Sequence, residues 1–194
     1  GCSTTLPVAP LLYQLPFDVT KALIPSVTLT AGQYMLVLHP TVKADNLKEF
    51  IAFAKAKPGS LNYASAGLGS PLNLAAELFK ARTGIAMTHV PYKGGGPASV
   101  AVLAGEVQVM FGSLPSVFPH VKAGRLKALA VTGPKRAAVA PGLPTIAESG
   151  FPGFEVTTWY GLMVPAGTPE RVRKILHDET AKAMQLPDVK EQIA

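Results

Sequence analysis

Short apolar runs alternate with amphipathic segments along most of the chain from residue 34 onward. Five runs have the length and composition of buried strands: residues 34–39, 61–64, 85–90, 107–111 and 126–132. The segments between them repeat apolar residues at the three-to-four-residue spacing of helices. This alternation predicts an α/β lobe over residues 34–131, with a mainly parallel sheet covered on both faces by helices.

Local signals mark where several helices begin. Asn46, with Glu49 three residues later, resembles a capping box. Ser70 followed by Pro71 has the order of an N-cap and a first helical residue. Near the end of the chain, Thr168-Pro169 predicts the start of a long amphipathic helix.

The two ends of the chain lack the regular alternation of strand and helix patterns seen from residue 34 to residue 131. Residues 1–33 contain turns and a strand-like segment but no self-contained unit, and residues 133–153 are rich in Pro and Gly. A strand-like stretch over residues 154–164 then precedes the long helix. We therefore predict that residues 1–33 and 132–194 form lobe 1, and that residues 34–131 form lobe 2.

Charge and composition narrow the classes of function. The formal net charge is +6, but the Lys and Arg residues are scattered and no run of three occurs. This pattern favours a basic surface that attracts anions over a nucleic-acid interface. The chain has one cysteine, Cys2, which excludes an internal disulfide, and no apolar run approaches the length of a membrane span.

The loop at residues 65–71 is the main candidate for ligand chemistry. It leaves a predicted strand and opens a helix, and ligands of parallel sheets bind outside the carboxyl ends of the strands. The free N–H groups and positive dipole end of a helix start suit an anion. Gly67 and Gly69 let the backbone approach a ligand, and Ser65 and Ser70 add hydroxyl donors. An ordinary strand-to-helix turn with a serine cap explains the same residues equally well.

A second Gly-rich loop, residues 91–97, also joins a strand to a helix. Tyr92 is placed to line a pocket and donate a hydrogen bond, whereas Lys93 is interpreted as a solvated side chain. In lobe 1, Trp159 and Tyr160 end a strand, where a ring would either close over a ligand or pack in the core.

The sequence contains no recognisable catalytic or metal-binding constellation. Its Gly-Ser pairs do not match a nucleophile elbow, and its four histidines, His39, His89, His120 and His177, are far apart. For the first three, a partly buried and hydrogen-bonded ring is the favoured interpretation. We therefore predict a binding protein with no metal, no cofactor and no enzymatic activity.

Several segments, taken in order, resemble one family of receptors. They are Tyr13–Asp18, Leu61–Pro71, His89–Gly94, Phe118–Val131, Leu143–Gly150 and Trp159–Pro169. Each segment is a weak signal alone. Together they span nearly the whole chain and resemble the solute receptors of tripartite tricarboxylate transporters, the Bug family.

The resemblance implies a two-lobed, type II periplasmic-binding-protein fold, with lobe 1 expected to be incomplete because the family's first strand is not recognisable. It implies an extracytoplasmic receptor that binds a small mono-, di- or tricarboxylate, aromatic ones included, and delivers it to permease subunits in the membrane. The implied ligand-binding residues are Ser65, Ala66, Gly67, Gly69, Ser70, Tyr92, Trp159 and Tyr160. A periplasmic location follows from the resemblance alone, since no signal peptide is recognisable, and we expect a monomer.

The chain departs from the family pattern at three places. Residues 6–10 read Leu-Pro-Val-Ala-Pro where the family often has His-Ala-Ile-Asn-Pro. Leu72-Asn73-Leu74 stands where the family has Ser-His-Leu. Phe111-Gly112-Ser113 stands where the family often has Phe-Asp-Asn, which removes an acidic group from the cleft wall. A different ligand preference is the expected result.

Two alternatives for the function stay open: a ligand-sensing domain of a regulator or signalling receptor, and a carboxylate-processing enzyme.

Overall fold

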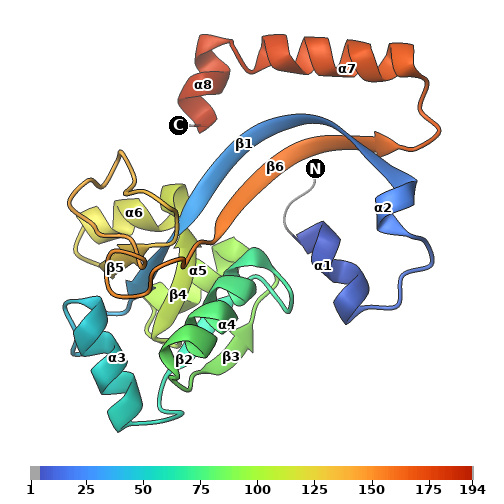
Figure 1. Cartoon of the computed structure of the whole chain (residues 1–194). Helices are drawn as coiled ribbons and strands as arrows, with labels where there is room; N and C mark the ends of the chain where they lie inside the picture. The colour runs from blue at the N-terminus through green and yellow to red at the C-terminus, as the bar shows by residue number, and fades with distance from the viewer. Residues whose placement is uncertain (1–4, 194) are drawn as a thin grey trace. The chain divides into compact units, whose positions relative to one another are not determined.

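The computed structural model describes residues 5–193, whose helices and strands are labelled in Figure 1. The chain divides into two compact units. Unit 1 takes in the chain up to residue 31 and from residue 158 onward, and unit 2 comprises residues 32–157. Strands β1 (Leu23–Leu38) and β6 (Thr157–Pro165) contribute residues to both units.

Unit 2 is built on the strand order β3-β2-β4-β1-β5. The bounds not yet given are β2 (Asn62–Ser65), β3 (Thr88–Pro91), β4 (Val109–Ser113) and β5 (Lys127–Val131). β2 pairs in parallel with β3 and β4, whereas β1 is antiparallel to β4 and β5. The predicted, mainly parallel sheet is thus confirmed for four strands. β1 alone runs opposite to the other four strands of this order.

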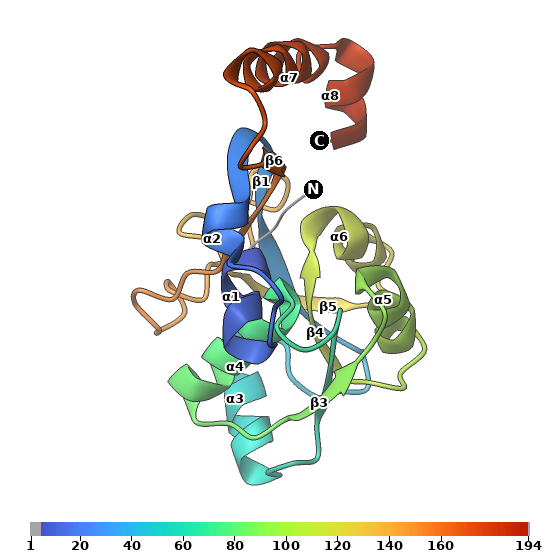
Figure 2. The ribbon, with the colours of Figure 1, turned by 90° about the vertical axis from the view of Figure 1, so that its right-hand side faces the viewer.

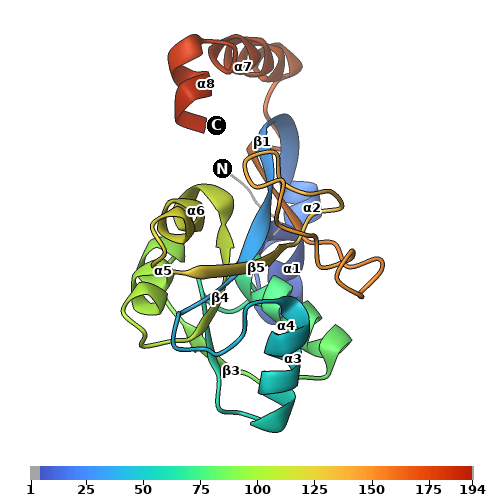
Figure 3. The ribbon, with the colours of Figure 1, turned by 90° about the vertical axis from the view of Figure 1, so that its left-hand side faces the viewer.

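Four helices cover the two faces of this sheet. They are α3 (Leu47–Ala56), α4 (Pro71–Thr83), α5 (Gly95–Leu103) and α6 (Leu114–Lys122). Figures 2 and 3 show α3 and α4 on one face and α5 and α6 on the other. The predicted helix starts are confirmed. Asn46 Oδ1 accepts the Glu49 N–H at 2.9 Å, and Ser70 Oγ accepts the Asn73 N–H at 3.3 Å.

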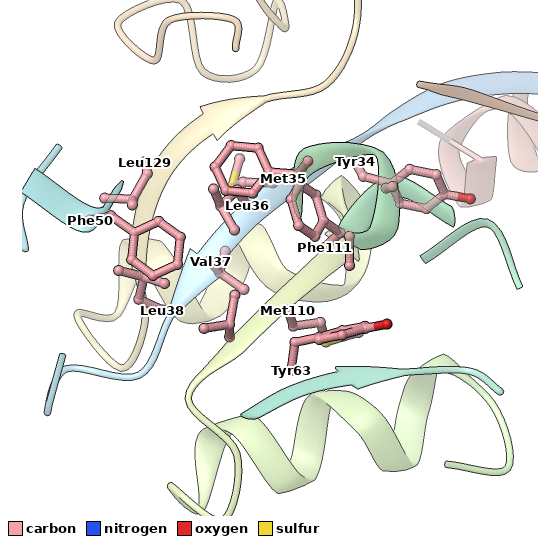
Figure 4. Packing of buried hydrophobic residues seen from close by; sticks show 14 of the residues in the cluster. Tyr34, Met35, Leu36, Val37, Leu38, Phe50, Tyr63, Met110, Phe111 and Leu129 are labelled. Atoms are coloured by element: carbon pink, nitrogen blue, oxygen red, sulfur yellow. The ribbon is translucent and has the colours of Figure 1, made fainter. Parts of the chain in front are cut away.

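The core of unit 2 lies between the sheet and these helices. Residues 34–38 of β1 are all buried, since both faces of the strand are covered, and Figure 4 shows their side chains with those of β2, β4, β5 and α3. On α4, the ring of Phe79 lies 5.7–6.3 Å, centroid to centroid, from four other rings: Phe50, Phe111, Phe151 and Phe154. This aromatic cluster joins α3, α4, β4 and the turn-rich segment that follows β5.

That turn-rich segment, residues 133–156, groups with unit 2, whereas the sequence predicted it to return to lobe 1. Thr132 explains part of the difference, because its Oγ1 accepts the Tyr34 N–H at 2.9 Å and donates to Val156 O at 2.6 Å. The segment also buries Ile146 and Phe154 in the core of unit 2. Single apolar anchors separated by turns leave no periodic pattern in a sequence, so periodicity did not reveal this packing.

Unit 1 contains the first half of β1 paired with β6, together with four helices in its described part. These helices are α1 (Thr5–Leu12), α2 (Val19–Ala22), α7 (Glu170–Ala183) and α8 (Pro187–Ile193). The predicted long helix is confirmed as α7, which is fastened to β1 by a hydrogen bond between His177 Nδ1 and Ser26 O at 2.8 Å. Of the helices formed by residues 5–193, none has the length and apolar character needed to cross a membrane.

Candidate functional site

The loop at residues 65–70 connects β2 to α4, as predicted, and its shape depends on two glycines. Gly67 has φ +116° and Gly69 has φ +72°, a region that side chains of L-residues rarely adopt. Ser70 then returns to extended backbone as the N-cap of α4, with Pro71 in the first helical turn. Ser65, Gly69 and Ser70 are buried, while Ala66 and Gly67 are half-buried.

Several hydrogen-bond donors of this loop are engaged inside the loop itself. The Gly67 N–H donates to Ser65 Oγ at 3.1 Å, and the Ser70 N–H donates to Gly67 O at 3.2 Å. The Gly69 N–H donates to Asn73 Oδ1 at 2.9 Å. The sequence predicted that Gly67 and Gly69 let the backbone approach a ligand closely, and it assigned the free N–H groups to the start of the helix that follows. In the structure, the N–H groups of both glycines take part in hydrogen bonds that fix the loop. Their role in ligand binding stays a prediction.

Ser65 forms a pair with His89 that the sequence did not predict. Its Oγ lies 2.6 Å from His89 Nε2, and the direction of this hydrogen bond depends on the tautomer of the ring. The His89 ring stacks on Tyr63, with centroids 4.9 Å apart and planes at 15°. Tyr63 and His89 are direct partners in the parallel β2–β3 register, which explains why their rings meet. The favoured interpretation of His89, a partly buried and hydrogen-bonded ring, is confirmed.

Behind the loop, a chain of hydrogen bonds runs along β2 and α4. Asn73 Nδ2 donates to Tyr63 Oη at 2.7 Å, and the Tyr63 hydroxyl donates to Glu77 Oε1 at 2.6 Å. Lys80 Nζ lies 2.8 Å from the same carboxylate. Burial, together with the Glu77 carboxylate, raises the pKa of Tyr63 above its usual range. Burial alone would raise the pKa of Glu77, but the hydrogen bonds from Lys80 and Tyr63 outweigh it and lower that pKa. At neutral pH a phenol therefore faces a carboxylate.

The second loop lies beside the first. The Tyr92 N–H donates to Ser65 O at 2.9 Å, and the half-buried Tyr92 ring packs against the core of unit 2. The side chain of Lys93 is exposed, in agreement with its interpretation as solvated. At the end of this loop, Gly94 precedes α5 without any side-chain cap. The structure thus brings Ser65, Ala66, Gly67, Gly69, Ser70 and Tyr92 together in unit 2.

Trp159 and Tyr160 lie on β6 in unit 1. Trp159 is half-buried and lines a pocket of about 540 Å³ with seven other residues of unit 1: Leu6, Val19, Thr20, Leu23, Pro25, Thr28 and Met163. Tyr160 is 50% exposed. The role of these two side chains in ligand binding stays a prediction.

On β4, Gly112 is held close to Val117. A Cβ atom at this position would overlap Val117 Cγ1 of α6, and both residues are buried. Val117 therefore fills the space that a larger residue at position 112 would need. Within residues 5–193, no three His, Cys, Asp or Glu side chains gather in a way that could hold a metal ion.

The environment of His89 predicts a dependence of stability on pH. Burial lowers the pKa of His89 below its ordinary value of 6.5, with Lys80 adding to the effect and Glu77 opposing it. Below about pH 6.5 the unfolded chain therefore binds more protons at this residue than the folded chain. The contribution of His89 to stability is complete above that pH and declines as the pH falls toward the folded-state pKa.

We expect His89→Gln, which does not titrate, to flatten this decline. Urea unfolding at about pH 5 and about pH 8 measures the free energy of unfolding of both proteins at both conditions. The difference between the two pH values should be smaller in the variant. An equal difference in both proteins would show that His89 does not contribute.

Solved structures of periplasmic binding proteins share the fold. The chain matches the periplasmic binding protein BugD with a TM-score of 0.92 and 28% identity, over 98% of this chain and 64% of that one. It matches MatC from Rhodopseudomonas palustris with bound malate with a TM-score of 0.89 and 30% identity, over 96% of this chain and 64% of that one. It matches an R. palustris protein with adipate with a TM-score of 0.85 and 31% identity, over 92% of this chain and 60% of that one. The fold is thus that of a two-lobed periplasmic binding protein, which confirms the predicted fold class.

Sequence comparison identifies the family. The profile of the tripartite tricarboxylate transporter family receptor matches residues 2–194. BugT from Bordetella pertussis is 37% identical over 184 residues, which is 95% of this chain and 56% of BugT. A UPF0065 protein of Pseudomonas sp., from the tcbD-tcbE intergenic region, is 38% identical over 193 residues, or 98% and 57%. The chain belongs to this family of receptors, and it spans a little over half the length of these relatives.

Proposed function

We propose that this chain is part of an extracytoplasmic receptor that binds a small organic carboxylate and delivers it to a tripartite tricarboxylate transporter in the membrane. The family supports the role of receptor. Two structures that match the chain over more than nine-tenths of its length contain malate and adipate, both dicarboxylates. A periplasmic location and permease subunits as partners are inferred from the same family.

The observation that carries the proposal is the arrangement of two helix starts at one edge of the sheet. β2 and β3 are parallel neighbours, so α4 and α5, which follow them, both begin at the carboxyl ends of the strands. Both helices direct the positive end of their dipole toward that edge, where a carboxylate is stabilised. The hydrogen bond from Tyr92 N–H to Ser65 O holds the two loops together. The net charge of +6 favours encounter with anions.

The same geometry favours a receptor over an enzyme. Ser65 and His89 form a pair of the kind that serves as nucleophile and base, but Ser65 is fully buried and its Oγ also accepts the Gly67 N–H. Among residues 5–193, no carboxylate hydrogen-bonds to the His89 ring to orient it as a base. We therefore propose that the ligand is bound and released unchanged. The family resemblance adds Trp159 and Tyr160 as proposed ligand contacts.

Thermal unfolding against a panel of small molecules tests the proposal. The panel contains malate, adipate and benzoate, with adipamide as an uncharged counterpart of adipate, and far-UV circular dichroism follows unfolding. A ligand at a hundred times its dissociation constant stabilises a folded protein by roughly 2.7 kcal/mol. We expect at least one carboxylate to raise the melting temperature while adipamide does not. Equal melting temperatures with and without every carboxylate would contradict the proposal.

A further inference from the structure

Asn73 contacts the candidate ligand loop at two points from inside the protein. Its side-chain Oδ1 accepts the Gly69 N–H at 2.9 Å, and its own N–H donates to Ser70 Oγ at 3.3 Å. Its Nδ2 donates to Tyr63 Oη at 2.7 Å. Asn73 is 3% exposed and Tyr63 is fully buried, so water does not compete for these hydrogen bonds.

We propose that Asn73 and Tyr63 are positioning residues that hold the loop at residues 65–70 in its binding conformation before the ligand arrives. This inference rests on the proposed function of the loop as a carboxylate site. A loop with two glycines has many alternative backbone conformations, and ordering it at the moment of binding would weaken the affinity. A buried side chain that fixes the Gly69 peptide removes that cost in advance.

The orientation of the Asn73 amide follows from the hydrogen bonds of Tyr63. The Tyr63 hydroxyl donates its proton to Glu77 Oε1 at 2.6 Å, and Lys80 lies 2.8 Å from that same oxygen. The oxygen of Tyr63 is then left as an acceptor, so the amide must turn its NH₂ group toward Tyr63 and its Oδ1 toward Gly69. The hydrogen bond to Tyr63 thus determines that the Oδ1 atom of Asn73, and not its Nδ2 atom, contacts the Gly69 N–H.

Tyr63 and Asn73 both lie outside the loop at residues 65–70, one on each side of it. Tyr63 lies on β2 before the loop, and Asn73 lies in the first turn of α4 after it. An amide offers an acceptor and a donor on one short side chain, which the two partners require. The chain's own combination of Tyr63 and Asn73 therefore sets how firmly this loop is held.

Two variants separate positioning from general stability. Tyr63→Phe removes only the hydroxyl and keeps the ring that stacks on His89, and Asn73→Leu removes both polar atoms of the amide. The matched control is Thr83→Val at the far end of α4, where a buried hydroxyl donates to Phe79 O at 2.7 Å. All three lose a buried hydrogen bond, but only the first two are connected to the loop.

The readouts are amide hydrogen exchange at Gly69, measured by NMR in the ligand-free chain, and the dissociation constant of the most stabilising carboxylate. We expect the Gly69 amide to exchange about ten times faster in Tyr63→Phe and in Asn73→Leu than in Thr83→Val. We expect the dissociation constant of the carboxylate to rise about tenfold in the same two variants, which corresponds to about 1.4 kcal/mol. The Thr83→Val protein should bind as the wild type does.

Each contrary outcome has a distinct meaning. Gly69 exchange no faster than in Thr83→Val would overturn the positioning role, whatever the ligand does. Faster exchange with unchanged affinity would show that loop order does not control capture, and would overturn the proposal at that step. A wild-type chain that binds no carboxylate would instead overturn the proposed function and the claim about capture together, a result visible before any variant is measured.

Discussion

Phe79→Ala is expected to lower the free energy of unfolding of unit 2 by about 3–5 kcal/mol, since it leaves a cavity at the centre of the core. The Phe79 side chain is fully buried, and its ring lies within 6.3 Å of four others, centroid to centroid. These rings come from α3, β4 and the segment after β5. Loss of Phe79 therefore removes contacts that join distant parts of the chain. Urea unfolding followed by far-UV circular dichroism measures the effect.

Phe53→Ala is the matched control for this substitution. Phe53 lies on α3 and packs against the same core while remaining partly exposed. We expect Phe53→Ala to lower the free energy of unfolding by clearly less, about 1–2 kcal/mol, because only part of the Phe53 ring is buried in an apolar environment. Equal losses for the two variants would show that the cluster around Phe79 is not the centre of the core.

Gly112→Asp is expected to destabilise unit 2 by about 3–5 kcal/mol. A Cβ atom at Gly112 would overlap Val117 Cγ1, and the carboxylate would enter a buried site. Overpacking and an unpaired charge therefore act in the same direction. Urea unfolding gives the loss in free energy.

The double variant Gly112→Asp with Val117→Ala separates the two causes. Removing the Val117 methyl groups opens the space beside position 112, so the pair should recover part of the stability lost by Gly112→Asp alone. Gly112→Ala, which adds the Cβ without the charge, should cost about 1–3 kcal/mol. Strictly additive losses in the double variant would mean that Val117 does not determine which residue fits at position 112.

Local signals predicted those parts of the fold that depend on neighbours in sequence. The Asn46–Glu49 capping box, the Ser70-Pro71 helix start and the loop between β2 and α4 all arise from contacts within a few residues. Such contacts follow from residue type and spacing alone. The place of the candidate loop between β2 and α4 could therefore be predicted from the sequence, together with the glycines that shape it. Its role in binding stays a prediction.

Contacts across the sheet could not be predicted in the same way. The stacking of Tyr63 on His89 depends on the β2–β3 register, and the role of Asn73 depends on where Tyr63 points. A one-residue shift in register would turn every side chain of a strand to the other face. Only the apolar setting of His89 gave any signal, and it predicted a hydrogen-bonded ring without naming the partner.

The position of Trp159 determines what optical methods report about this protein. It is the only tryptophan in the chain, and it lines the apolar pocket of unit 1. Intrinsic fluorescence excited at the indole band therefore follows the unfolding of unit 1, whereas the phenylalanine cluster around Phe79 in unit 2 emits almost nothing by comparison. Unfolding curves from fluorescence and from circular dichroism will coincide only where the two units lose structure together. Any separation between the curves shows, in one sample and without a label, that the two units do not unfold in a single cooperative transition.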